Sequence, residues 1–134
     1  QGPAWLEALA ADGSDPGAPV PALARDDEGL LRADWAPLMG WMAGPEIDPA
    51  DRAAGFHAAL AGLIAELVRV LARDREFDAV GLTGGVFQNA LLARLAIDAI
   101  EGAGRAALLP GRVPVNDAGI AYGQIIEVIG ASKR

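Results

Sequence analysis

The chain has 134 residues, of which 52% are hydrophobic and 22% are charged, and its formal net charge is −7. This length suits one domain or a fragment of a larger one, and the apolar content is high enough to bury a core. The acidic balance argues against a nucleic-acid partner, because neutralising phosphates requires clustered Lys and Arg. The chain has no cysteine, which excludes disulfides, thiolate zinc sites and a cysteine nucleophile.

Targeting signals are missing from the sequence. No apolar run approaches the roughly 20 residues that cross a bilayer, and the first residues lack the pattern of a signal peptide. The absence of cysteine fits a reducing compartment. We therefore expect a cytoplasmic protein with no membrane partner. Gln1 is not a natural start residue, so we also expect an excised domain or a processed form.

The N-terminal part is predicted to differ from the rest. Residues 1–28 are rich in Pro, Gly and Asp, which predicts irregular chain apart from a helical turn around Trp5–Ala10. We expect the domain proper to cover residues 29–134. It would begin with a short strand at Leu30–Ala33 and a helix at Trp35–Ala43.

A long helix is the clearest element of the sequence. Asp48-Pro49 pairs a capping residue with proline at the first helical position, which predicts a helix that runs to about Asp74. Large apolar residues recur along it at helical spacing. This stripe consists of Phe56, Leu60, Leu63, Ile64, Leu67, Val68 and Leu71.

Strands and helices alternate in the second half of the chain. We expect a buried strand at Phe77–Leu82, a helix at Phe87–Glu101, a strand at Ala106–Leu109 and a helix at Asp117–Gly130. This order is typical of a parallel sheet with right-handed crossovers. The predicted fold class is therefore α/β, with a small, mostly parallel sheet flanked by helices.

The first candidate site is a glycine-marked turn after the Phe77–Leu82 strand. A glycine pair, Gly84-Gly85, lets the chain turn sharply and lets a ligand approach the backbone closely. Thr83, Gln88 and Asn89 add polar side chains beside it. A tight strand-to-helix turn with nothing bound would explain the glycines equally well.

The second candidate site is the turn at Asn116-Asp117, ahead of the last predicted helix. Asp at a helix start is most often an N-cap, worth about 1 kcal/mol. The functional alternative makes Asp117 an oxygen ligand for a metal. One carboxylate cannot hold a metal, so further ligands would have to come from elsewhere.

His57 is the single histidine, and it lies beside the apolar stripe of the long helix. A lone histidine in that position is more often a packed, hydrogen-bonded residue than a metal ligand. No Ser–His–Asp arrangement is evident, so the catalytic residues remain unassigned.

Three motifs in this order resemble one family. Residues 83–89, TGGVFQN, are similar to the SGGVFQN signature of the HypF-type hydrogenase maturation carbamoyltransferases. Residues 109–124, LPGRVPVNDAGIAYGQ, resemble that family's RVPPNDGG…GQ segment, and residues 56–61, FHAALA, resemble its FHxxLA helix. The stretch at residues 34–38 also fits, and residues 1–28 match only loosely.

This resemblance implies a specific activity. Such enzymes take carbamoyl phosphate and ATP, form carbamoyl adenylate, and transfer the carbamoyl group to the C-terminal cysteine of a HypE-type acceptor protein. The site lies between two lobes of an actin/hexokinase/Hsp70-like domain, beside a divalent metal. The chain would be the C-terminal lobe. An antibiotic-type O-carbamoyltransferase lobe is a weaker alternative.

Carried over by position, Thr83, Gly84, Gly85, Gln88, Asn89 and Asn116 would line the nucleotide site, and Asp117 would be the metal ligand from this lobe. Ala118 stands where the family has glycine, and it adds a methyl group near the expected ligand. The family's metal-binding histidines and upstream domains have no counterpart here. We therefore expect the chain alone to be inactive and to bind little or no nucleotide. A non-catalytic assembly module, pairing with itself through an exposed inter-lobe face, is the alternative function.

Overall fold

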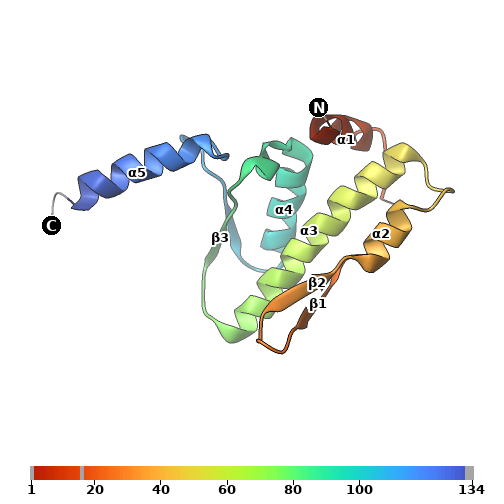
Figure 1. Ribbon diagram of the computed structural model, residues 1–134, viewed down its shortest axis with the longest axis horizontal. Helices are drawn as coiled ribbons and strands as arrows, with labels where there is room; N and C mark the ends of the chain where they lie inside the picture. Colours follow the sequence, from red (N-terminus) through yellow and green to blue (C-terminus); the bar gives the residue numbers. More distant parts are fainter. Residues whose placement is uncertain (1, 16, 132–134) are drawn as a thin grey trace.

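The computed structural model describes residues 2–15 and 17–131. Residues 1 and 16, in the segment predicted to be irregular, and residues 132–134 lie outside the described part. One long helix, α3, runs through the domain, and the other elements except α5 lie around it (Figure 1). In chain order these are α1 (Gly2–Ala10), β1 (Ala22–Arg25), β2 (Leu31–Asp34), α2 (Ala36–Met42), α3 (Pro49–Asp74), β3 (Ala79–Gly81), the 3-10 helix η1 (Gly85–Gln88), α4 (Ala90–Gly102), β4 (Ala106–Leu108) and α5 (Ala118–Ala131).

The N-terminal segment contains more regular structure than its composition predicts. Helix α1 has 9 residues, about two and a half turns, where only a turn around Trp5–Ala10 was expected, and it packs against α3. Strand β1 pairs with β2 in an antiparallel hairpin, with Ala22 opposite Asp34. Among the described residues of this segment, irregular chain lies between α1 and β1 and in the turn that follows β1. Helix α1 is stabilised by its contact with α3 and strand β1 by its pairing with β2. Composition alone does not reveal these contacts.

Helix α3 begins and ends where the sequence predicts. The Asp48 carboxylate accepts a hydrogen bond from the Ala50 N–H at 2.8 Å, and Pro49 is the first helical residue. The buried positions, however, are mostly small residues rather than the large apolar stripe: Ala53, Gly55, His57, Ala59, Ala61, Leu63, Ala65 and Val68. Small residues let neighbouring elements approach closely on two sides of the helix.

Two close contacts show this approach. A methyl group added at Gly55 would come within 2.5 Å of the Trp41 ring, and one at Gly62 within 2.7 Å of Val20. By length and composition alone, α3 is the one helix in the described part of the chain that could cross a membrane. Its packing against α1, α2, α4 and β1 is that of the core helix of a folded domain.

Strands β3 and β4 pair in parallel, as the alternation of strands and helices predicts, with Val80 opposite Ala107. Helix α4 connects them and packs against α3, and their interface holds the main core cluster: Val68, Leu82, Ala96 and Ile100. The strands are divided between two separate two-stranded sheets. The α/β class is confirmed. Helix α4 starts at Ala90 rather than Phe87, because the 3-10 turn η1 comes first.

The last helix, α5, projects away from the rest of the domain (Figure 1). None of its residues is buried. Its large apolar side chains are about half exposed or more: Ile120, Tyr122, Ile125, Ile126, Val128 and Ile129. A helix that is apolar on all sides is normally buried. This end of the chain is therefore the least covered part of the described structure.

Candidate functional site

The two turns singled out in the sequence lie against each other. The Gly84 N–H donates a hydrogen bond to the Val115 carbonyl at 2.7 Å. The Thr83 hydroxyl lies 3.5 Å from the same carbonyl oxygen. A methyl group added at Gly85 would stand 3.9 Å from Cβ of Asn116. Residues about 30 positions apart thus form one continuous backbone surface at the end of strand β3, where open α/β sheets bind ligands.

The first turn has a backbone shape that requires glycine. Gly84 has φ +110° and ψ 154°, a region that side chains exclude. The N–H groups of Gly85 and Val86 then begin the 3-10 helix, and neither has a hydrogen-bond partner in the described part of the chain. Both residues are exposed. Adjacent unpaired N–H groups are suited to an anion.

Asn89 joins this turn to two helices. Its Oδ1 accepts a hydrogen bond from the Leu92 N–H at 2.8 Å, which makes it the N-cap of α4. Its Nδ2 lies 2.7 Å from Nε2 of His57 on α3. The carboxamide is therefore engaged at both ends within the protein. Gln88, in contrast, is exposed and its side chain makes no hydrogen bond within the described residues.

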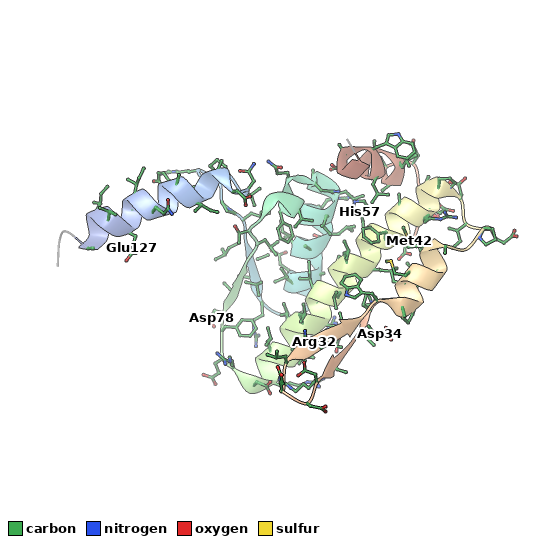
Figure 2. All side chains as sticks on the ribbon, viewed as in Figure 1. Arg32, Asp34, Met42, His57, Asp78 and Glu127 are labelled. Atoms are coloured by element: carbon green, nitrogen blue, oxygen red, sulfur yellow. The ribbon has the colours of Figure 1, made fainter. Side chains whose placement is uncertain are left out.

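His57 is almost fully buried, at 2% exposed. Figure 2 labels it on α3, beneath α1. Its Nδ1 lies 2.7 Å from the Ala53 carbonyl oxygen. A carbonyl can only accept, so Nδ1 carries the proton and Nε2 accepts from the Asn89 amide. The structure thus gives His57 the packed, hydrogen-bonded role that was expected, and adds a partner that the sequence did not indicate.

Glu7 on α1 is a site residue that sequence reasoning missed. Its Oε1 accepts hydrogen bonds from the Ala90 N–H at 2.7 Å and the Leu91 N–H at 3.2 Å, at the start of α4. A carboxylate at this position satisfies two otherwise unpaired donors and complements the helix dipole. The contact spans more than 80 residues of sequence, so no local pattern could have indicated it.

A cavity of about 720 Å³ opens between α1, α3 and the first turn. Its walls are largely apolar, and Glu7, His57, Gln88 and Asn89 supply polar groups. The full lining is Ala4, Trp5, Leu6, Glu7, Phe56, His57, Leu60, Gly85, Val86, Gln88, Asn89 and Leu92. Of the predicted site residues, this cavity gathers three, while Thr83, Gly84, Asn116 and Asp117 lie outside its lining.

The second turn presents Asp117 to solvent. The Asn116 Oδ1 accepts a hydrogen bond from the N–H of Ala118, the first residue of α5, at 3.1 Å. The Asp117 carboxylate is exposed and has no partner among the described residues. No group of three or more His, Asp or Glu that could hold a metal occurs in residues 2–15 and 17–131. Asp117 therefore fits a metal only with ligands from outside this chain.

Comparisons with known proteins agree with this arrangement. Residues 1–124 match the family described as carbamoyltransferase, Kae1-like domain, second subdomain. The match includes the N-terminal segment that resembled the family only loosely. The carbamoyltransferase HypF of Rhodobacter capsulatus is 39% identical over 121 residues, which are 90% of this chain and 15% of that protein.

Two solved structures have the same fold. A full-length HypF in a phosphate- and nucleotide-bound form superposes with a TM-score of 0.78 at 24% identity, covering 89% of this chain and 16% of that one. HypF of T. kodakarensis gives a TM-score of 0.70 at 25% identity, covering 86% and 15%. The chain thus spans only a small part of the length of these relatives. It belongs to the family of Kae1-like second subdomains of carbamoyltransferases.

Proposed function

We propose that this chain forms one wall of the carbamoyl-adenylate site in a longer HypF-type carbamoyltransferase. The complete enzyme would use ATP and carbamoyl phosphate, and would transfer the carbamoyl group to the C-terminal cysteine of a HypE-type acceptor during nickel–iron hydrogenase maturation, in the cytoplasm. The observation that carries this proposal is the contact between the two family-like turns, through Gly84 and Val115. Two separate motifs thus meet at one surface, at the end of strand β3.

Each part of this surface has a task that its chemistry suits. The unpaired N–H groups of Gly85 and Val86 would donate to phosphate oxygens. Gln88 and Asn116 lie beside them with polar side chains. The Asp117 carboxylate would bind a divalent metal together with ligands of the missing lobe, and such an ion would neutralise phosphate charge. Asn89 would act by holding the turn in place, since its carboxamide is already engaged.

The proposal predicts that the isolated chain binds ATP weakly or undetectably, because it supplies half a cleft and one metal ligand. Isothermal titration calorimetry with magnesium and ATP measures this directly. In the longer protein, Asp117→Ala should lower carbamoyl transfer at least about tenfold, which corresponds to about 1.4 kcal/mol of transition-state stabilisation. Asp78→Ala removes another exposed carboxylate, which Figure 2 labels near the start of β3, at the opposite end of the strand from the first turn, and serves as the matched control.

Two outcomes would contradict these expectations. Micromolar ATP binding by the isolated chain, abolished by Asp117→Ala, would show that the other lobe is not required. Equal activity of the Asp117 and Asp78 variants of the longer protein would show that the second turn is not part of the active site.

The exposure of α5 favours a second candidate function, assembly through this helix. Ile126 is 51% exposed and Tyr122 is 53% exposed, and they are neighbours on one face of the helix at i, i+4 spacing. Under the carbamoyltransferase proposal, the remainder of the longer protein covers this face. Under the alternative, a second copy of this chain covers it and the chain is a stand-alone module.

Light scattering on the isolated chain discriminates between them. The module function predicts a dimer at micromolar concentration, which Ile126→Glu converts to a monomer that retains most of the helical circular dichroism signal of the chain. A clean monomer at high concentration contradicts it. Arg94→Glu, at an exposed position of α4, controls for the effect of a new charge.

A further inference from the structure

His57 is unusual among the buried residues of α3. The neighbouring buried positions are Ala53, Gly55, Ala59 and Ala61, which are small and apolar. A polar ring that is 2% exposed is costly to bury unless its nitrogens are hydrogen-bonded. Both nitrogens have partners here, at 2.7 Å each. The buried ring therefore makes a specific hydrogen bond to the Asn89 carboxamide in addition to its packing contacts.

The donors and acceptors around the ring form one consistent chain. The Leu92 N–H can only donate, so the Asn89 oxygen faces α4 and the Asn89 nitrogen faces His57. Nε2 of His57 must then accept, and its proton sits on Nδ1, opposite the Ala53 carbonyl. If donor and acceptor were exchanged in any one of these hydrogen bonds, two donors or two acceptors would face each other elsewhere in the chain of bonds.

We infer that His57 is a positioning residue for the first glycine-marked turn, acting through Asn89. Asn89 directly follows η1, and its own N–H donates to the Val86 carbonyl at 3.2 Å. Fixing its carboxamide between α3 and α4 therefore fixes the turn that carries the Gly85 and Val86 N–H groups. The value of this rigidity for phosphate binding rests on the proposed function, whereas the link itself is a property of the fold.

The alternative is that His57 only fills space in the core. Three variants separate the roles. Asn89→Ser keeps a side-chain oxygen that can cap α4 but removes the donor to His57. His57→Leu keeps the volume but removes the acceptor, while His57→Gln retains an amide that can accept from Asn89.

Nuclear magnetic resonance of the chain provides the measurement. Because there is one histidine, the ring gives a single pair of nitrogen signals, expected as a protonated Nδ1 and an unprotonated Nε2. In Asn89→Ser the Nε2 signal should shift. The hydrogen-bonded amides of Phe87 and residue 89 should exchange about two- to tenfold faster, as expected for the loss of one hydrogen bond. His57→Leu should do the same, and His57→Gln should restore slow exchange.

Asn116→Ser is the matched control. The Asn116 side chain also accepts a backbone hydrogen bond at the start of a helix, from the Ala118 N–H, and has no hydrogen bond to His57. It should leave the ring signals and the Phe87 amide unchanged. The inference is overturned if Asn89→Ser leaves both as in the wild type, or if the wild-type proton lies on Nε2.

The test does not depend on every variant folding. If His57→Leu unfolds, Asn89→Ser still decides, because it leaves the buried ring in place. The spectra are recorded without nucleotide, so a failure of the proposed carbamoyltransferase function would not change them.

Discussion

The two glycine-marked turns differ in how the rest of the domain holds them. The first is held by hydrogen bonds to several elements, through Gly84 to the second turn, through Asn89 to α3 and α4, and through Glu7 at the start of α4. The second turn lies between an extended segment and α5, a helix with no buried residue. One half of the surface is thus held by several hydrogen bonds within this chain, and the other half borders an uncovered helix.

This difference indicates how the complete site is divided. A rigid turn can present backbone donors at fixed positions without a partner. A turn that precedes an exposed apolar helix is fixed in position only when other protein packs against that helix. The chain spans 15% of the length of its Rhodobacter capsulatus relative, so enough additional protein exists in such relatives to cover it.

The strongest test of this contrast compares two isoleucines. Ile100 is fully buried in the α3–α4 core, whereas Ile126 on α5 is 51% exposed. Ile100→Ala should lower the free energy of unfolding by about 2–5 kcal/mol, because it leaves a cavity. Ile126→Ala should change it by no more than about 0.5 kcal/mol. Urea unfolding followed by circular dichroism measures both, and similar losses would mean that α5 packs on the domain.

Much of the fold could be predicted from local sequence signals. Asp48-Pro49 gave the start of α3 because a capping side chain and a fixed proline φ act within one turn. Strands β3 and β4 followed from short apolar runs that end at glycine or proline. The positions of the two glycine-marked turns were also correct. That they meet follows from the parallel pairing of β3 and β4, which continues through the bond from Leu82 to Leu108.

The remaining features depend on contacts between distant residues. Asn89 was predicted to contact a ligand, yet its side chain is held by His57, 32 residues earlier in the chain. Helix α1 is ordered by α3, and Glu7 reaches α4 across the molecule. Asp117 was expected as an N-cap or a metal ligand, but its side chain makes no hydrogen bond among the described residues, and the Ala118 N–H bonds Asn116 instead. Neither composition nor periodicity carries this information.

A second test concerns the backbone of the first turn. Gly84→Ala should cost about 1–3 kcal/mol, because φ +110° is strained for any side chain. Gly85→Ala should cost less than about 1 kcal/mol, since Gly85 is not among the positive-φ residues and the added methyl meets only Cβ of Asn116, at 3.9 Å. Thermal unfolding of both variants is the measurement. If Gly85→Ala were the more destabilising of the two, contact between the turns, and not the backbone conformation of Gly84, would determine the stability of the first turn.

A smaller effect is expected at the start of α4. Glu7→Gln keeps an oxygen that can accept from Ala90 and Leu91 but removes the negative charge. The loss should be about 0.3–1 kcal/mol, the usual range for a charge at a helix N-terminus. Chemical denaturation at low and high salt measures it, and the difference should shrink as salt rises. Glu101→Gln, an exposed position near the C-terminus of α4, is the control and should not destabilise the chain.

The smallest expected effect lies in the β1–β2 hairpin, away from both turns. Hydrogen bonds from the Arg32 side chain and then from the Leu30 and Glu28 N–H groups lower the pKa of Asp26 below its ordinary value of 3.8. Because the pKa of Asp26 is lower in the folded state, ionised Asp26 stabilises the fold. This stabilisation is complete above the pKa of the unfolded chain and is lost as the pH falls through the pKa of the folded chain. The Leu30 amide signal should therefore shift below about pH 4 in the wild type and should lack that step in Asp26→Asn. The Phe87 amide of the first turn should not follow the Asp26 step. If it did, protonation of Asp26 would be destabilising the whole domain and not the β1–β2 hairpin alone. The structure of the first turn would then depend on the hairpin, which its hydrogen bonds do not indicate.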